Sequence, residues 1–377
     1  MNGQVAVIGG GIGGLSTALA LHRRGIDCAV YERAPEIHEI GSAIGIWPSA
    51  IRVFDRLGVG DAVRALGGAW TYGGLRRYDG KYLMRYTSEQ FAARLGEPMI
   101  GVHRGELQAL LLNALPDGMT HTNKELASFD DHGGGVTARF VDGTSIETPV
   151  LIAADGRRSS VRTTLFGTGE LHDCGVMGWR GTPSPAPAGS DWNEFTGEFW
   201  GPDGRFGVLP IGGGRVCWFG VARQFRSGGL DEVAERFGAW AHPIPALIAA
   251  TNEEHVWRDR LDDMWPRMRW TKGRVALLGD AAHPMTPDLG LGACIAIMDA
   301  EVLAEELAGG ADTADALRRY NKRRRRKAAK VVLAARAMTM GARSENPAAV
   351  RARIRLMALG PPPSIMLRQF KFLADGP

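Results

Sequence analysis

The chain has 377 residues, enough for about two to three domains, and its 45% apolar and 23% charged residues are typical of a globular protein. The net charge of +4 is small and no apolar run reaches the roughly 18 residues of a membrane helix, so we expect neither a nucleic-acid partner nor a membrane span. The four cysteines, Cys28, Cys174, Cys217 and Cys294, form no CxxC pair. They predict no metal site and favour reduced thiols in a cytoplasm, and the sequence opens on a strand pattern instead of a signal peptide.

The first elements are a strand, a glycine turn, a helix and a second strand. Residues 4–8 are apolar and β-branched, and residues 9–14 read Gly-Gly-Gly-Ile-Gly-Gly. Apolar residues recur at helical spacing over 15–24, and a second buried strand over 28–31 ends at Glu32. This order is typical of a nucleotide-binding βαβ unit.

The glycine turn has GxGxxG spacing at Gly9, Gly11 and Gly14. The first glycine permits the tight turn, the second lets backbone N–H groups approach a pyrophosphate, and the third lets the helix pack on the strand. The helix N-terminus favours phosphate, and Glu32 stands at about the distance expected of the acid that binds ribose hydroxyls. A lone GxGxxG is a weak signal, but here the strand, the helix and the acid support it.

The next segments contain a loop, a helix and an aromatic stretch. Residues 41–46 are small enough for backbone to pass close to a ligand, and residues 48–57 predict a helix. Residues 68–100 interleave arginine with aromatic side chains, which favours sheet strands with alternating faces over a single-stranded nucleic-acid surface. A buried strand over 150–154 stops at Asp155, which indicates either a cofactor-facing loop or only a turn before a helix.

The second half of the chain changes character. Residues 192–221 predict short antiparallel strands in a second domain. The buried-strand pattern returns over 274–280, and helices are expected over 295–307 and 313–340. The basic run 322–327 lies inside that last helix, where a solvated face with one or two inward arginines is favoured over a nucleic-acid patch.

Three of these motifs resemble, in order, those of the FAD-dependent aromatic hydroxylases. These enzymes are single-component flavoprotein monooxygenases with the para-hydroxybenzoate hydroxylase fold. The motifs are the glycine turn with Glu32-Arg33, the pair Asp155-Gly156, and residues 279–292 with their Gly-Asp-Ala-Ala-His and Gly-Leu-Gly segments. The chain is most similar to the urate, salicylate and hydroxybenzoate hydroxylase subgroup. The resemblance covers nearly the whole chain.

The resemblance implies an α/β fold with a Rossmann-like FAD-binding domain of the glutathione-reductase type. A mostly antiparallel substrate sheet is inserted in it, and a helical segment follows. The expected ranges are 1–70, 101–168 and 271–345 for the FAD-binding domain, 71–100 and 169–270 for the substrate domain, and 346–377 for a helical tail broken at 361–363.

The resemblance also implies which residues hold FAD. Glu32 would bind the adenosine ribose, Arg33 and Arg104 would lie near the nucleotide and the pyrophosphate, and Asp280 would bind the ribityl chain. Residues 290–294 would run beside the isoalloxazine, with the helix dipole stabilising the reduced flavin. The complete expected set is Gly9, Gly11, Gly13, Gly14, Glu32, Arg33, Gly45, Arg104, Leu126, Asp155, Asp280, Gly290, Leu291, Gly292, Ala293 and Cys294.

Arg205, Cys217 and Pro287 are the expected catalytic residues. By resemblance, Arg205 matches an arginine near the substrate in urate-oxidising relatives, and Cys217 stands where those relatives have a tyrosine. Pro287 is expected at the flavin ring. Because side chains alternate along a strand, Cys217 and Phe219 should point together, away from Trp218.

Several positions depart from the family's usual residues. Leu291 stands where Gln is frequent, Met298 where Glu is frequent, and Cys294 where Asn is frequent. We interpret these changes as making the pocket more apolar, which favours a larger substrate such as a polyketide over a small anion. For His283 we expect a structural hydrogen bond in preference to proton transfer.

The resemblance implies a monooxygenase that uses FAD, NADPH or NADH as a transient co-substrate, and O2. A flavin C4a-hydroperoxide would hydroxylate an aromatic or polyketide-like small molecule, in a monomer or homodimer. The alternatives are Baeyer–Villiger or epoxidising oxygen insertion, and a flavin-binding isomerase or reductase without O2 chemistry.

Overall fold

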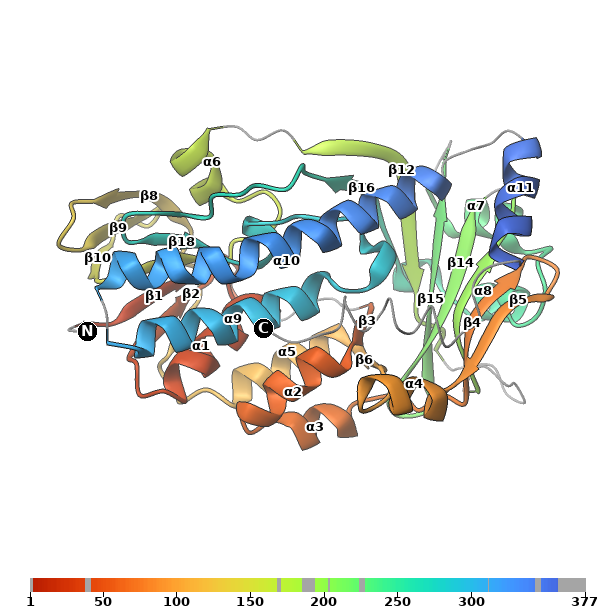
Figure 1. Ribbon diagram of the computed structural model, residues 1–377, viewed down its shortest axis with the longest axis horizontal. Helices are drawn as coiled ribbons and strands as arrows, with labels where there is room; N and C mark the ends of the chain where they lie inside the picture. Colours follow the sequence, from red (N-terminus) through yellow and green to blue (C-terminus); the bar gives the residue numbers. More distant parts are fainter. Residues whose placement is uncertain are drawn as a thin grey trace.

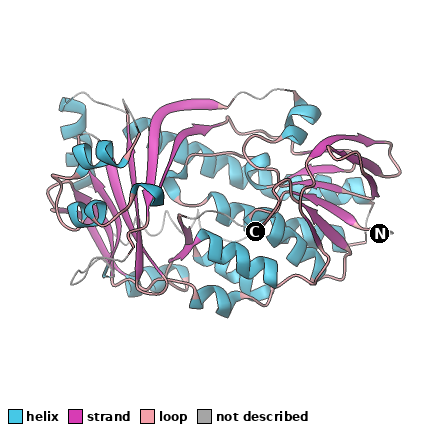
Figure 2. Cartoon of the chain, turned by 180° about the vertical axis from the view of Figure 1, so that it is seen from behind, coloured by secondary structure: helices cyan, strands magenta, loops and turns pink. Residues whose placement is uncertain are grey.

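Two large sheets at opposite ends of the molecule organise the fold, and helices run along its length between them (Figure 1). The computed structural model describes residues 3–37, 42–167, 171–184, 194–202, 204–223, 228–310, 312–342 and 347–358. The view from behind shows the same division, with the larger sheet on the left and the smaller one near the N-terminus (Figure 2).

The six-stranded sheet has the order β17-β18-β11-β1-β2-β7. Its members are β1 (Val5–Ile8), β2 (Cys28–Tyr31), β7 (Thr120–His121), β11 (Leu151–Ala153), β17 (Thr271–Lys272) and β18 (Val275–Leu277). All neighbours pair in parallel except β17 and β18. The four central strands are fully buried, as parallel strands covered on both faces are, and their carboxyl ends share one edge.

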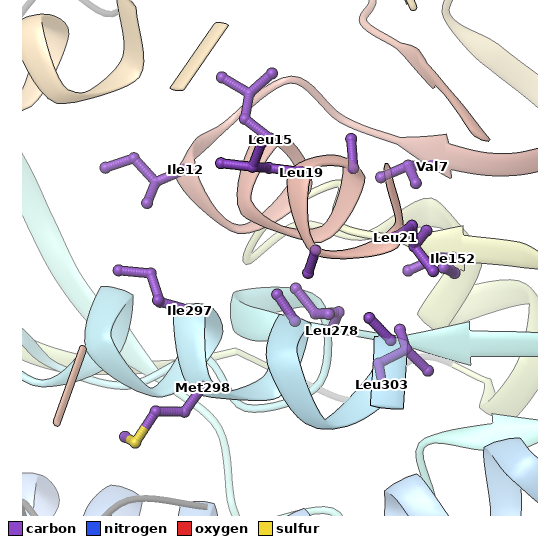
Figure 3. Close-up of a cluster of buried hydrophobic side chains, with 14 of the residues drawn as sticks. Val7, Ile12, Leu15, Leu19, Leu21, Ile152, Leu278, Ile297, Met298 and Leu303 are labelled. Atoms are coloured by element: carbon purple, nitrogen blue, oxygen red, sulfur yellow. The ribbon is translucent and has the colours of Figure 1, made fainter. Parts of the chain in front are cut away.

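Two helices cover this sheet and form the centre of the core. α1 (Ile12–His22) packs on α9 (Gly292–Ala308), and Leu15, Leu19, Ile297 and Leu303 belong to one buried cluster around the two helices (Figure 3). Met298 is buried in the same cluster. The expectation that Met298 makes the substrate pocket apolar is therefore wrong, because its side chain packs in the protein core.

The seven-stranded sheet has the order β16-β12-β15-β14-β13-β4-β5. Its members are β4 (Tyr72–Arg77), β5 (Tyr82–Thr87), β12 (His172–Gly181), β13 (Phe195–Trp200), β14 (Arg205–Ile211), β15 (Arg215–Ala222) and β16 (Val256–Asp263). Every pair is antiparallel except β13 with β4. One face packs Phe199, Phe206 and Trp218 against α7 (Leu230–Phe237) and α8 (Ile244–Ala249).

Smaller elements complete the described part of the chain. The strands are β3 (Ala43–Ile46), β6 (Ile100–His103), β8 (Leu126–Asp131), β9 (Val136–Phe140) and β10 (Ser145–Thr148). The remaining helices are α2 (Pro48–Arg56), α3 (Gly60–Ala65), α4 (Ser88–Leu95), α5 (Arg104–Asn113), α6 (Ser160–Phe166), α10 (Thr313–Ala342) and α11 (Pro347–Ala358). Within the described ranges, no helix has the length and apolar character that a bilayer crossing requires.

Long helix α10 joins the two ends of the molecule. It has 30 residues, so it extends about 45 Å, from the six-stranded sheet toward the seven-stranded sheet (Figure 1). In its basic run, Arg324 is buried against Asp299 while Arg323 pairs with Glu305 and Glu306 at the surface. The expected solvated face with one inward arginine is confirmed.

The structure tests three further sequence interpretations. The Arg/Tyr stretch forms β4 and β5 of a sheet, with Arg76 and Arg85 stacked over aromatic rings of its own domain. Helix α9 begins at Gly292, three residues earlier than expected. The helical tail is confirmed over α11, whereas the expected break at 361–363 lies outside the described residues.

Candidate cofactor and substrate site

Four neighbouring parallel strands end at the same edge of the sheet, and each is followed by a glycine or an acidic residue that the sequence predicted to lie there. Ile8 pairs with both Tyr31 and Ala153, and Ala153 pairs with Leu277. The residues that follow these strands are Gly9, Glu32, Asp155 and Asp280. The carboxyl edge of an open parallel sheet is where such folds bind ligands. The sequence thus predicted this convergence.

One position in the turn after β1 and one in the first turn of α1 accept only glycine. Gly9 has a φ of +109°, and a Cβ there would lie 2.4 Å from the Ala154 carbonyl oxygen. A Cβ on Gly14 would lie 1.9 Å from the Gly9 carbonyl oxygen. α1 begins beside them with no side-chain cap and no acid in its first turn, which leaves its N-terminus suited to an anionic phosphate.

Glu32 is held close to this turn. Its Oε2 accepts from the Gly10 N–H at 2.6 Å and its Oε1 from the Ala34 N–H at 2.9 Å, and the carboxylate has further acceptor sites for ribose hydroxyls. Gln108 of α5 donates to the Gly10 carbonyl at 2.8 Å. Leu126 lies just beyond Lys124, whose N–H donates to the Glu32 carbonyl, so Leu126 lies near the expected adenosine position. Arg33 is exposed.

Asp155 carries an orphaned acceptor. Its Oδ2 accepts from the Val161 N–H at 3.3 Å, while its buried Oδ1 has no partner among the described residues. Burial raises the pKa of this carboxyl above its usual value. A buried acceptor without a partner costs free energy, so this atom fits a ligand hydroxyl or N–H. These contacts favour the cofactor-facing interpretation of the Asp155 loop.

Asp280 is the exposed acid of the set. It lies in the short turn Gly279–Ala281, and a Cβ on Gly292 would lie 4.0 Å from its Oδ1, so the carboxylate is close to the start of α9. Arg104, at the start of α5, reaches solvent, but many protein atoms lie around its guanidinium group. The surrounding protein disfavours its charge and lowers the pKa of Arg104, and the Asp280 charge opposes the shift.

The segment from Pro287 to Cys294 connects the two sheets. Pro287 is exposed, Gly290 has a φ of +60°, and Leu291 caps α9. The Cys294 thiol is buried against β3, where its sulfur accepts from the Trp47 N–H at 3.4 Å and lies 3.5 Å from the Gly45 carbonyl oxygen. Gly45 and Cys294, both expected beside the flavin, thus contact each other.

Arg205, expected near the substrate, is paired with two carboxylates. Its Nη2 donates to Asp288 at 2.7 Å and its Nη1 to the two oxygens of Glu198 at 3.2 and 3.3 Å. Burial opposes its charge, but the two carboxylates outweigh burial and raise its pKa. Asp288 also accepts from Thr339 of α10 at 2.7 Å. Arg205 therefore joins the seven-stranded sheet to the loop before α9.

Cys217 lies on the expected face of that sheet. Phe219 shares this face, and Trp218 is buried on the opposite one, as predicted. Cys217 pairs across the strands with Leu209, whereas Arg205 pairs with Val221. The Ala43 N–H donates to the Cys217 sulfur at 3.4 Å, and burial raises the pKa of the thiol. The thiol is thus protonated and holds β3.

His283 belongs to a buried network behind the site. Its Nε2 lies 2.6 Å from Asp299, which also accepts from Arg324 at 2.6 Å. Although burial works against it, Arg324 and His283 lower the pKa of Asp299. The network joins the turn after β18 to α9 and α10. This arrangement agrees with the structural role expected for His283.

Sequence reasoning missed Glu198, Asp288 and Tyr86 as site residues. Each is acidic or aromatic in a segment that looks like an ordinary strand or loop. The hairpin turn between Trp200 and Arg205 was the available signal for Glu198. In this hairpin Trp200 pairs with Arg205, and Glu198, two residues before Trp200, lies on the same face of the sheet.

Comparison with known proteins identifies the family. Residues 2–335 match the family described as FAD binding domain. The chain belongs to this FAD-binding family. The FAD-binding family assignment agrees with the strand ends, the glycine turn and the orphaned acceptor of Asp155, all of which fit a long dinucleotide cofactor.

Proteins similar in sequence to this chain include hydroxylases and monooxygenases. It is 38% identical over 322 residues to the aurachin C monooxygenase/isomerase of Stigmatella aurantiaca, covering 84% of this chain and 83% of that protein. It is 35% identical over 345 residues to the FAD-dependent urate hydroxylase of Klebsiella pneumoniae subsp. pneumoniae, covering 88% of each. Klebsiella pneumoniae HpxO complexed with FAD and uric acid superposes with a TM-score of 0.91 at 30% identity, covering 99% of this chain and 97% of that chain.

These similarities confirm three sequence-based predictions. The chain has the fold of the FAD-dependent aromatic hydroxylases, FAD is its cofactor, and its function class is that of an FAD-dependent monooxygenase acting on aromatic small molecules. The roles of individual site residues stay predictions.

Proposed function

We propose that the protein uses NAD(P)H and O2 to hydroxylate an aromatic or polyketide-like small molecule. The observation that carries the proposal is the placement of Asp155 and Asp280 at one sheet edge, with Asp280 close to the loop 287–294 that Arg205 joins to the second sheet. Bound FAD would supply oxygen activation after its reduction by NAD(P)H. The residues of the chain would bind the cofactor, orient the substrate and exclude water.

We propose specific roles along the cofactor. Glu32 binds the adenosine ribose beside Leu126, the N-terminus of α1 binds the pyrophosphate, and Arg104 contributes positive charge there. Asp280 binds the ribityl hydroxyls, and the start of α9 stabilises negative charge on the ring. The cofactor domain comprises residues 1–70, 101–168 and 271–345, and the substrate domain comprises 71–100 and 169–270.

The expected catalytic residues take different roles in this proposal. Pro287 is exposed, like Gly290 in the same loop, and would contact the flavin or the substrate. Arg205 and Cys217 would act as positioning residues, because one holds the loop through Asp288 and the other holds β3 through Ala43. The four buried free thiols support a reducing, cytoplasmic compartment.

The test is a turnover assay with product analysis. Protein loaded with FAD should oxidise NADH or NADPH faster in the presence of an aromatic substrate, consume O2, and yield a product heavier by one oxygen atom. Using ¹⁸O2 should place the label in the product. Flavin reduction without any oxygen transfer, across aromatic and polyketide panels, would contradict the proposal.

A second candidate is oxygen insertion coupled to isomerisation. The relative from Stigmatella aurantiaca is named a monooxygenase/isomerase, and it shares 38% identity with this chain. The same assay separates the two, because isomerisation changes the product skeleton while the mass gain stays at one oxygen.

A further inference from the structure

The face of the seven-stranded sheet that carries Arg205 also carries Glu198. In the strand order, β13 lies between β14 and β4, and Glu198 pairs with Gly207 on one side and with Leu75 on the other. Phe199 points to the opposite, core face. The contacts of Arg205 with Asp288 and of Cys217 with Ala43 show that this face looks toward the cofactor domain.

Two glycines on this face make room for two aromatic rings. A Cβ on Gly207 would lie 2.1 Å from the Cε1 and Cζ atoms of Phe219, so the Phe219 ring extends from β15 across β14. A Cβ on Gly73 would lie 2.4 Å from Cε2 and 3.1 Å from the hydroxyl of Tyr86, so that ring extends from β5 across β4. Both rings thus point toward β13 and Glu198 from opposite sides.

Contacts connect both sides of this group to the loop before α9. The Tyr86 and Phe91 ring centroids are 6.0 Å apart, and those of Phe91 and Trp47 are 5.6 Å apart. A Cβ on Gly290 would lie 3.8 Å from the Trp47 indole nitrogen. One series of contacts joins Asp288, Arg205 and Glu198, and a second joins Gly290, Trp47, Phe91 and Tyr86; the charge of Glu198 acts on Tyr86. Both series therefore begin on the loop expected beside the flavin.

The charges of Asp288, Arg205 and Glu198 disfavour an anionic ligand. One guanidinium, Arg205, is shared by the two carboxylates of Glu198 and Asp288, so the cluster offers no uncompensated positive charge to an anion. Burial raises the pKa of Glu198, Arg205 opposes this shift and the charge of Asp288 adds to it. The side chain of Asp288 is 0% exposed and that of Arg205 is 3% exposed, whereas that of Glu198 is 15% exposed. Glu198 is thus the member that a ligand can reach, and a ligand carboxylate there would meet like charge.

Tyr86 supplies the complementary donor. Its hydroxyl makes no hydrogen bond within the described part of the chain, although its ring is packed against Trp70 and Phe91. Burial, with a smaller contribution from the charge of Glu198, raises the pKa of Tyr86 to about 12. The phenol therefore stays protonated at neutral pH and can donate to an acceptor beside Glu198.

Arg180 is a cation on the same face. It lies on β12, where it pairs with Phe219 of β15, and its strand is about 14 Å from β13, which carries Glu198. Burial is the main cause of the lowered pKa of Arg104, and the positive charge of Arg180 adds a smaller contribution in the same direction. Arg180 therefore lies toward the cofactor end of the site.

We propose that Glu198 and Tyr86 form a recognition pair for the lactam edge of an uncharged aromatic substrate. Glu198 accepts from the ring N–H, and Tyr86 donates to the adjacent carbonyl, while Phe219 packs against the ring. The site then selects neutral hydroxylated N-heteroaromatic rings over aromatic carboxylates. This inference rests on the proposed monooxygenase function, whose substrate class it specifies.

The test measures ligand binding to the FAD-loaded protein by calorimetry and by the change in flavin absorbance. Three probes are matched in shape: 2-quinolone carries the lactam edge, N-methyl-2-quinolone lacks the N–H, and quinoline-2-carboxylate carries an anion. The native protein should bind 2-quinolone at least about tenfold more tightly than the other two, as loss of a hydrogen bond to a charged group implies.

Two variants assign this preference to the pair. Tyr86→Phe removes only a hydroxyl with no partner among the described residues, and it should weaken 2-quinolone binding about tenfold while FAD stays bound. Glu198→Gln should reduce the discrimination against quinoline-2-carboxylate about tenfold. Tyr78→Phe is the matched control, because Tyr78 packs at a tilted angle against Trp240 away from this face, and it should leave all three affinities unchanged.

The outcomes separate this inference from the proposed function. Protein that takes up FAD but fails to bind 2-quinolone, binds the carboxylate as tightly, or responds equally to Tyr86→Phe and Tyr78→Phe overturns the recognition pair alone. Protein that takes up no FAD overturns both.

Discussion

Arg205 on β14 donates to Asp288 at 2.7 Å across 83 residues of sequence, and this buried contact joins the seven-stranded sheet to the loop that precedes α9. Both side chains are almost completely buried. Loss of one partner of such a pair leaves the other charge buried without full compensation.

Asp288→Ala should therefore lower the free energy of unfolding by about 3 kcal/mol. This is the lower end of the cost of removing one partner of a buried ion pair, because Glu198 still pairs with Arg205. The free energy of unfolding in urea, followed by circular dichroism, measures the effect. Asp315→Ala is the control, since it breaks the exposed pair with Arg318 and should cost about 1 kcal/mol or less. Equal costs for the two variants would show that the buried contact contributes nothing special.

Gly14→Ala should disrupt the cofactor turn. The new Cβ would lie 1.9 Å from the Gly9 carbonyl oxygen, so the backbone must shift, which costs about 1–3 kcal/mol or more and displaces the N–H groups of the turn. Gly134→Ala is the matched control, because the nearest atom to its Cβ is 3.7 Å away. Thermal unfolding and FAD titration of both variants test the prediction. Tight FAD binding by the Gly14 variant would contradict the assigned close approach.

The cofactor edge was predictable because its pattern is local. Parallel strands carry their carboxyl ends to one edge, so buried runs followed by Glu32, Asp155 and Asp280 indicate a common site without any knowledge of tertiary contacts. The glycine turn adds a steric requirement that can be read from spacing alone. The structure places all three acids at this edge.

The substrate face was not predictable in the same way. Glu198 shares a sheet face with Tyr86 only because β4, from residues 72–77, pairs in parallel with β13, from residues 195–200. No local periodicity specifies such a pairing across a long insertion. In sequence, Asp288 resembles a loop acid and Glu198 a surface acid, since burial of a charge depends on its distant partners.

Buried thiols make the protein sensitive to alkaline pH. Burial raises the pKa of Cys294 from its usual value of 9.0 to about 12. Between these values the unfolded chain releases the proton and the folded chain keeps it, so the free energy of unfolding falls by about 1.4 kcal/mol per pH unit for this thiol. Cys294→Ser should remove this part of the slope while preserving the hydrogen bonds to β3.

Urea unfolding of the native protein and the Cys294→Ser variant at pH 8, 9, 10 and 11 measures the two slopes. Cys28, whose pKa is also raised to about 12 by burial and by Asp27, remains in both proteins and serves as the internal reference. Parallel slopes for the two proteins would mean that the Cys294 thiol ionises in the folded state as it does in water.

Asp280→Ala should weaken FAD binding while the fold survives. Asp280 is exposed at the end of β18, so its removal buries no unpaired group and opens no cavity in the core. A carboxylate that accepts from ribityl hydroxyls contributes about 1.5–3 kcal/mol, which corresponds to a roughly 10- to 150-fold rise in the dissociation constant of FAD. Fluorescence titration of the apoprotein gives that constant, and thermal unfolding of the same apoprotein should be unchanged. Asp117→Ala, an exposed acid in the loop after α5, should leave both measurements at their native values. An unaltered FAD constant in the Asp280 variant would move the ribityl contact to Asp155, whose orphaned Oδ1 is the other acceptor at this edge.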